Sequence, residues 1–106
     1  MNEPAIVTLK RGSLYLSRAI YDRYFHGLEG IVLLRREGDL LILPVRHAAA
    51  GGYFLKLCNS AGDRVVTAPD FFREHGADDG LERRLPVSWV SARAALVAVG
   101  AFDLQT

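Results

Sequence analysis

The sequence predicts a mainly β domain with two short helices (α+β), in which two similar halves each run strand, strand, helix, strand, strand. Short aliphatic and β-branched runs alternate with glycine-containing turns. Two aromatic segments with helical spacing interrupt these runs. The order of elements in residues 5–46 returns in residues 53–100. We therefore interpret residues 1–106 as a single domain with an internal repeat, a linker at residues 47–52, and a tail at residues 101–106 that we expect to fray.

The first half opens with a predicted hairpin. The strand-forming runs 5–10 and 14–16 flank Arg11-Gly12-Ser13, where Gly12 can adopt a positive φ. Ser17 suits the N-cap of a helix over residues 18–26, because its hydroxyl can accept a hydrogen bond from an orphan amide. The remaining features of this half are Gly27 as helix stop, strands at 30–34 and 40–45, a polar turn at 35–39, and Pro44 near a strand end or on an edge.

The second half repeats this order. A strand over residues 53–58 and a strand over 64–66 flank a strong turn signal at residues 59–63. A short helix follows at residues 70–75, with Pro69 in its first turn and Thr67 or Asp70 as its cap. The remaining features are Gly76 as helix stop, a loop at 77–84, strands at 85–90 and 95–99, and a turn at 91–94.

Individual residues of the two halves also correspond. Residues 12–17 align with residues 62–67, which matches the turn glycine, the strand and the hydroxyl that follows it. The helices then match through three pairs: Tyr21 with Phe71, Arg23 with Arg73, and Gly27 with Gly76.

Several apolar residues are predicted to be core. Ile20, Tyr21, Tyr24 and Phe25 form an aromatic and aliphatic stripe, which typically packs against a sheet. We expect Trp89 in the core or at a subunit interface. Cys58 ends an apolar run and is expected to be a buried thiol that acts as a small hydrophobe.

Composition and motifs narrow the function classes. The formal net charge of +1 argues against coating nucleic acid by bulk charge, although it permits a local basic patch. One cysteine, no apolar leader and no long apolar run favour a cytoplasmic protein without a membrane span. His26, His47 and His75 lack metal-ligand spacing, and we expect no enzyme activity, no metal and no cofactor. Arg35-Arg36 and Arg83-Arg84 are interpreted as ordinary surface charge.

The layout resembles the swapped-hairpin DNA-binding family of AbrB, MazE and MraZ. The stretches that carry the resemblance are residues 10–18, then Tyr21-Asp22-Arg23 and residues 37–44, with residues 62–66 as the weaker second unit. The closest likeness is to MraZ-type proteins, in which two such units lie in one chain. This resemblance implies a dimer or larger ring whose hairpin arms present basic side chains to DNA. The residues that match are Lys10, Arg11, Arg18 and Arg23, with Arg64 and Arg73 as their counterparts in the second half.

The chain also departs from the family pattern. Ser13 stands where an arginine usually follows the turn glycine, and Leu16-Ser17 replaces an Ile-Pro-type pair. Asp63 separates Gly62 from Arg64, and a carboxylate there would repel phosphate. Two hypotheses therefore stay open. The first is a homo-oligomeric transcriptional regulator that binds DNA through its basic hairpin turns. The alternative is a protein-interaction or assembly module on the same fold, such as an operon accessory factor or an antitoxin-like partner.

A third hypothesis, a small enzyme or ligand-binding domain, has no supporting cluster of convergent polar groups in the sequence. We expect no small-molecule substrate. A deep pocket lined by Cys58 or by two of the histidines would reopen this hypothesis.

Overall fold

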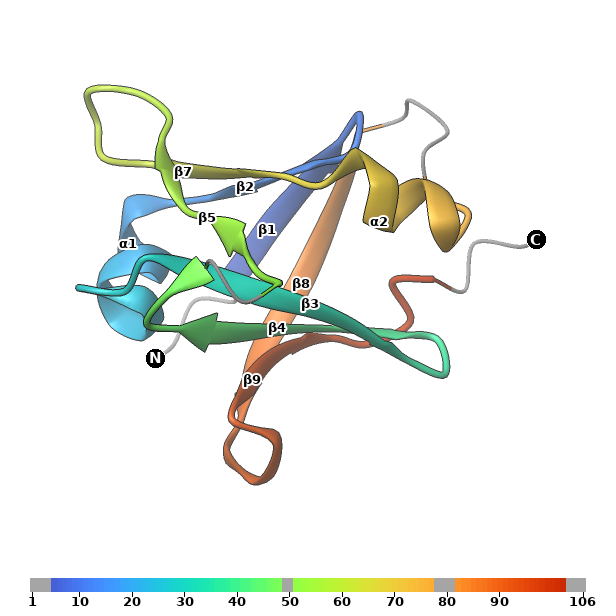
Figure 1. The fold of residues 1–106 in the computed structure, drawn as a ribbon. Coiled ribbons are helices and arrows are strands. Elements are labelled where there is room, and N and C mark those ends of the chain that lie inside the picture. Colours follow the sequence, from blue (N-terminus) through green and yellow to red (C-terminus); the bar gives the residue numbers. More distant parts are fainter. Residues whose placement is uncertain (1–4, 49–50, 78–81, 103–106) are drawn as a thin grey trace.

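A computed structural model describes residues 5–48, 51–77 and 82–102 of the chain. Strands dominate these residues, and antiparallel pairing joins them into one nearly closed barrel with two short helical segments (Figure 1). The strands are β1 (Ala5–Lys10), β2 (Ser13–Leu16), β3 (Gly30–Arg36), β4 (Asp39–Val45), β5 (Tyr53–Phe54), β6 (Lys56–Leu57), β7 (Arg64–Thr67), β8 (Arg83–Val90) and β9 (Ala95–Ala98). The helical segments are α1 (Arg18–Ile20), which continues as the π-helical turn Tyr21–Phe25, α2 (Pro69–Glu74), and a 3₁₀ turn at Ser91–Arg93.

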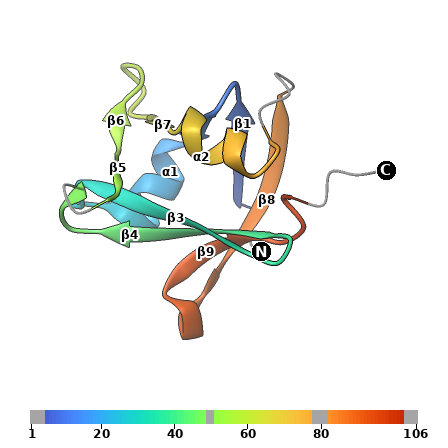
Figure 2. The ribbon, with the colours of Figure 1, turned by 45° about the vertical axis from the view of Figure 1, so that its right-hand side comes forward.

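The strand order explains how the barrel closes. In the described part of the chain the order is β5-β3-β4-β9-β8-β1-β2-β7-β6, and every pair is antiparallel. The first and last strands of this order, β5 and β6, are separated in the chain only by Leu55. One extended segment thus pairs with β3 at one end and with β7 at the other, and Figure 2 shows it bridging the two sides of the barrel.

The strand pairs follow an approximate two-fold symmetry. Exchanging β1 with β5–β6, β2 with β7, β3 with β8 and β4 with β9 turns each observed pair into another observed pair. The pairs β2–β7 and β4–β9, on opposite sides of the barrel, map onto themselves. Tyr15 and Val65, which the sequence repeat aligns, lie directly opposite each other in the β2–β7 pair. The two-fold axis therefore crosses the sheet close to Tyr15 and Val65.

The core lies inside the barrel. Alternate residues of each strand point inward, as the two-residue period of a strand requires. The largest fully buried side chains include Phe25 from the first helical segment and Phe72 from α2, so each helical segment contributes a phenylalanine to the core. Ile20 is also buried, and Tyr21 and Tyr24 pack against the core, which confirms the expected role of the aromatic stripe.

The helix ends follow the predicted chemistry in the first half but not in the second. Ser17 caps α1, since its Oγ accepts a hydrogen bond from the Ile20 amide at 3.2 Å. Neither Thr67 nor Asp70 caps α2: the N-cap is Ala68, without a side-chain hydrogen bond. Thr67 stays in β7, where it pairs with Ser13 of the neighbouring hairpin, and this pairing displaces the expected cap.

Several predicted strand bounds are wrong. β3 extends to Arg36 and β4 already starts at Asp39, so the polar turn between them is only two residues long. The expected strand 53–58 is interrupted at Leu55, because the chain changes its partner strand there. The Leu55 amide donates a hydrogen bond to the Glu29 carbonyl at 3.0 Å. β8 starts at Arg83 rather than at residue 85, since Arg83 and Arg84 already pair with β1.

The predicted burial of Cys58 is wrong, and so is the predicted fraying of the tail at residues 101 and 102. Cys58 is exposed, because it lies beyond the end of β6. Trp89 is 36 % exposed and stacks on Tyr24, so it lies outside the core, and its place at a subunit interface stays a prediction. Phe102 is buried, with 6 % of its surface exposed, and its amide donates a hydrogen bond to the Gly38 carbonyl at 2.9 Å. The expected linker lies partly outside the described residues, which omit 49–50, and so do tail residues 103–106.

Candidate nucleic-acid interface

The β1–β2 turn presents Lys10 and Arg11 from a fixed position. Arg11 and Gly12 have φ values of 54° and 79°, the pair of positive angles that a tight two-residue hairpin turn requires. The Gly12 carbonyl accepts a hydrogen bond from the Ala68 amide at 2.8 Å. A Cβ atom at Gly12 would lie 2.6 Å from Pro69 Cα, so only glycine lets the turn sit on the start of α2. The two cationic side chains are exposed, while the backbone beneath them is locked.

The second hairpin turn sits on the first helix in the same way. A Cβ atom at Gly62 would lie 2.8 Å from Arg18 Cδ, and the Arg18 amide donates to Asp63 Oδ1 at 2.9 Å. Asn59 supports this turn: its Oδ1 accepts from the Ala61 amide at 3.0 Å, and its Nδ2 donates to Asp63 Oδ2 at 3.1 Å. The hairpin of each half therefore contacts the helix start of the other half.

Asp63 has a structural role that sequence reasoning missed. Its hydrogen bond from Asn59, and then the one from the Arg18 amide, hold the pKa of the Asp63 carboxyl below its usual value. The carboxylate satisfies one of the amides that a helix start leaves without a partner. An interpretation of Asp63 only as a repulsive charge toward phosphate overlooks this bond.

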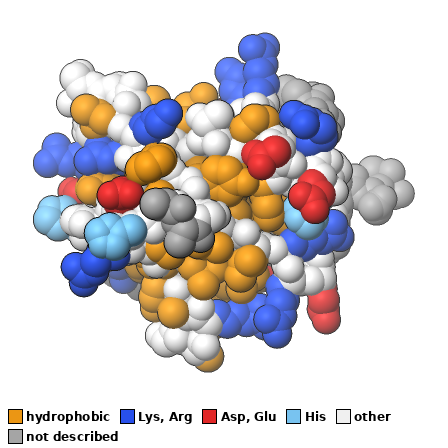
Figure 3. All heavy atoms as spheres, viewed as in Figure 1, with side chains coloured by type: hydrophobic (Ala, Val, Ile, Leu, Met, Phe, Trp, Pro, Cys, Tyr) orange, Lys and Arg blue, Asp and Glu red, His pale blue; other side chains and the backbone are white. Residues whose placement is uncertain are grey.

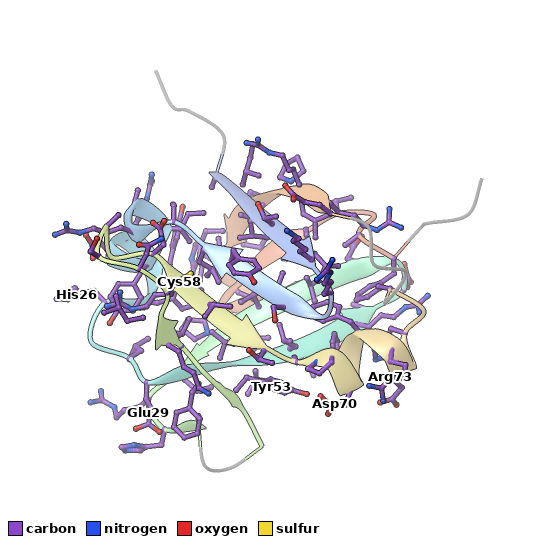
Figure 4. The ribbon with its side chains drawn as sticks, turned by 90° about the horizontal axis from the view of Figure 1, so that it is seen from above. His26, Glu29, Tyr53, Cys58, Asp70 and Arg73 are labelled. Atoms are coloured by element: carbon purple, nitrogen blue, oxygen red, sulfur yellow. The ribbon has the colours of Figure 1, made fainter. Side chains whose placement is uncertain are left out.

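The six predicted DNA-binding residues fall into two groups at opposite ends of β2 and β7. The register pairs Ser13 with Thr67 at one end and Leu16 with Arg64 at the other. Lys10, Arg11 and Arg73 belong to the end where α2 starts, and Arg18, Arg23 and Arg64 to the end where α1 starts. Figure 4 shows the same separation, with Arg73 on α2 and Cys58 toward the opposite end of β7.

The group at the start of α1 is engaged in local contacts. The Arg64 guanidinium lies 3.9 Å from the centroid of the Tyr21 ring and donates to the Gly62 carbonyl at 2.7 Å. Arg18 forms an ion pair with Asp22 at 3.4 Å, a pair that is exposed and so contributes little stability. The Arg23 guanidinium lies 5.3 Å from the Tyr24 ring centroid. Of these three arginines, Arg64 is the most withdrawn from solvent.

A cross-strand row that the sequence did not predict joins the two hairpins. Lys56 pairs with Val65, Val65 with Tyr15, Tyr15 with Thr8, and Thr8 with Arg84. Directly paired residues share a face of a sheet, and the flanking residues Val7, Leu14 and Val66 are buried. The row therefore lies on the outside of the barrel. We call the outer surface of β8, β1, β2, β7 and β6 the hairpin face.

The hairpin face carries Tyr15 and Val65 at its centre and a cation at each end of the row. Tyr15 is 37 % exposed at the centre, near the two-fold axis, and Lys56 and Arg84 are exposed at the ends. With adjacent strands about 4.8 Å apart, four strand spacings place these two cations about 19 Å apart along the sheet. Lys10 and Arg11 lie at the tip of the same hairpin.

Two hollows adjoin this row. One, of about 310 Å³, lies among Thr8, Tyr15, Cys58, Asp63 and Arg84. The other, of about 500 Å³, lies between β1 and the first helical segment, and Arg84 lines both. Cys58 lines the first of these hollows, which is open to solvent and is not the deep pocket that would reopen ligand binding.

The opposite side of the barrel has a different character. Leu41, Ala95 and Val97 of β4 and β9 are buried in a second apolar cluster, against which Leu43 and Val90 pack. Figure 3 shows hydrophobic side chains gathered over β3 and β4, with Lys and Arg side chains around the rim.

A side-chain hydrogen bond connects β5 with α2. Tyr53 Oη donates to Asp70 Oδ2 at 3.3 Å, and Figure 4 shows the two side chains pointing toward one another. Burial, and then the charge of Asp70, raise the pKa of the Tyr53 hydroxyl. The contact ties β5 to the helix on which the first hairpin turn rests.

The histidines lie apart. His26 and His75 end the two helical segments, as their sequence positions predict, and His47 Nδ1 is 4.0 Å from Glu29 Oε1. Across residues 5–48, 51–77 and 82–102, no three His, Cys, Asp or Glu side chains gather closely enough to hold a metal ion. No helix in these ranges has the length and apolar character of a membrane span.

Comparison of the chain with protein-family models, with curated proteins and with solved structures finds no significant match.

Proposed function

We propose that this protein binds DNA through the hairpin face, as a transcriptional regulator of the AbrB and MraZ swapped-hairpin type. The observation that carries the proposal is the tight turn at Arg11-Gly12, which fixes the backbone that bears two exposed cationic side chains. Groups that are positioned before binding lose less conformational freedom when they contact a phosphate. Long basic side chains at such a turn can reach both phosphates and base edges.

The contacts between each hairpin turn and the helix of the other half support the same proposal. Each turn rests on the helix start of the other half, which is the arrangement that a swapped-hairpin fold would have. Lys56 and Arg84 extend the positive surface on either side of the two-fold axis. Because the net charge is only +1, this local placement has to supply the electrostatic attraction.

A fluorescence-anisotropy titration tests the proposal. The protein is titrated against duplex DNA from upstream of its own gene and against a scrambled duplex, at low and physiological salt. We expect tighter, salt-sensitive binding to the upstream DNA. The variant K10A/R11A should weaken binding and lower the slope of log K against log salt by about 1.8, since each phosphate contact contributes about 0.9.

The matched control is R36A/R93A, which removes the same charge from the turns β3–β4 and β8–β9. It should bind with nearly the affinity of the unaltered protein. Equal losses in the two double variants would show that charge alone matters and would remove the assignment to the β1–β2 turn. Absence of binding at low salt would overturn the proposal as a whole.

The alternative, a protein-interaction module on the same fold, has its own supporting observation. Val99, Leu57, Phe54 and Leu34 are 78 %, 65 %, 52 % and 46 % exposed, which is a high exposure for large apolar side chains. Analytical ultracentrifugation tests this alternative through self-association. A protein that stays monomeric at high micromolar concentration, and that captures no stoichiometric partner, would contradict it.

A further inference from the structure

The hollow between β1 and the first helical segment has the chemistry of a ligand site. It encloses about 500 Å³, within the range of small-molecule pockets. Ile6, Ala19 and Ile20 form the aliphatic part of its lining, and Tyr24 also lines it. Arg23 and Arg84 reach it from the first helical segment and from β8, so two elements far apart in sequence each supply a guanidinium group.

The charges around the hollow are of one sign. Its described lining contains both arginines and no carboxylate. Asp22, the acidic residue of the same helical segment, forms its ion pair with Arg18 instead. A guanidinium group is rigid and matches a carboxylate with two parallel hydrogen bonds. An anion that enters this hollow therefore meets two suitable donors and no like charge.

The aliphatic lining residues determine which group the ligand must have besides its negative charge. A bare ion would leave Ile6, Ala19 and Ile20 uncovered, whereas a hydrocarbon tail would remove their surface from water. The Tyr24 ring already stacks on Trp89, at 5.5 Å between centroids, and already has the Arg23 guanidinium above it. This arrangement disfavours a ligand that stacks on Tyr24, such as a nucleotide base, and favours an aliphatic tail.

We propose that this hollow binds a small carboxylate with an apolar tail, whose carboxylate lies between Arg23 and Arg84 and whose tail covers Ile6, Ala19 and Ile20. The site goes beyond the proposed DNA binding, and its test contains no DNA. The two proposals therefore fail independently.

The chain carries a natural reporter for this site. Trp89 is its single tryptophan, and it stacks on the Tyr24 ring that lines the hollow. Octanoate is the probe, titrated while Trp89 emission and the heat of binding are followed. Octanol serves as the neutral tail and inorganic phosphate as the anion without a tail. We expect a saturable change in emission with octanoate, and neither comparison compound should reproduce it.

Variants locate the binding. R23A and R84A should each weaken octanoate binding by about 10-fold or more, the loss expected for one charge-assisted bidentate contact. A19F should block the hollow from the exposed side of α1, and R93A should bind like the unaltered protein. Circular dichroism shows whether each variant remains folded. If R23A or R84A unfolds, the lysine substitution at the same position replaces it, with a smaller loss expected.

Two results would overturn the proposal. The first is the absence of saturable octanoate binding at millimolar concentrations. The second is binding that survives A19F and both arginine variants, which would place octanoate elsewhere, for example on the exposed apolar side chains of β3 and of the turn after β9.

Discussion

Ile42 and Leu96 lie directly opposite each other between β4 and β9, and both are completely buried. These strands exchange with each other when the two halves exchange, so the approximate two-fold axis crosses the sheet within this pair of strands. The pair joins the halves on the side of the barrel opposite the hairpin face. The burial of these two side chains therefore stabilises the association of the two halves.

We expect I42A and L96A each to lower the free energy of unfolding by about 2–5 kcal/mol, because each leaves a cavity in the core. The double variant should show a coupling energy of about 0.5–3 kcal/mol, as neighbouring core residues do. Urea denaturation measures both quantities. V99A, at a position that is 78 % exposed, is the control and should change stability by less than about 0.5 kcal/mol. Strict additivity would contradict the contact.

A comparison of Gly12 with Gly27 distinguishes the cost of backbone strain from the cost of a steric clash with another part of the chain. Their φ values are 79° and 78°, but a Cβ at Gly12 would lie 2.6 Å from Pro69 Cα, whereas nothing lies within 4 Å of one at Gly27. G27A should cost about 1–2 kcal/mol, the penalty of the left-handed conformation. G12A should cost clearly more, because the hairpin must also move away from α2. Similar thermal and urea midpoints for the two variants would argue against a tight seat on α2.

Asp63 predicts a specific acid sensitivity. Its pKa is lowered in the folded protein from an ordinary value of 3.8, so the unfolded state binds the proton more readily. Stability from this group is therefore complete above the ordinary pKa and is lost as the pH falls through the folded value. In D63N the unfolding free energy should fall less steeply with acidification over this interval. Parallel pH profiles of D63N and the unaltered protein would contradict the assignment.

Lys56 and Arg84 predict two separable contributions to DNA binding, which rest on the proposed function. K56A and R84A should each reduce the salt slope by about 0.9, because each removes one cation from an end of the row. R93A, which removes an exposed arginine from the 3₁₀ turn, provides the control. A slope that changes in K10A/R11A but in neither of these variants would restrict the contact surface to the hairpin tip.

Phe102 predicts that the chain is anchored close to its end. F102A should destabilise the protein by about 3–5 kcal/mol, since the ring is buried among Phe71, Phe72 and His75. L57A, at a position that is 65 % exposed, should be nearly neutral in the same denaturation experiment. Little effect of F102A would support the expectation of a frayed tail from the sequence.

Local chemistry was the part of the fold that the sequence revealed. The Gly12 turn, the Ser17 cap and the inward side of the first helix depend on neighbours a few residues away, and the structure confirms them. The exposure of Lys10 and Arg11 followed from the same turn. Such signals are short-range and can be read from residue types and spacing.

Features that depend on a distant partner escaped prediction. Cys58 ends an apolar run that looks like one buried strand, yet the run changes partner at Leu55 and leaves the thiol exposed. The row through Tyr15 and Val65 requires the register of strands that lie fifty residues apart in sequence. Arg84 looked like ordinary surface charge, because nothing near it in sequence indicates its place beside Thr8 and the two hollows.

The interleaving of the halves also governs how the chain can fold. β1 needs β8, β2 needs β7, and β4 needs β9, so neither half can complete its sheet while the other is missing. Such non-local pairings require long loops to close before their contacts contribute, and domains of this kind fold in about milliseconds to seconds. During synthesis, both outer edges of the first hairpin therefore stay unpaired until β7 and β8 have left the ribosome.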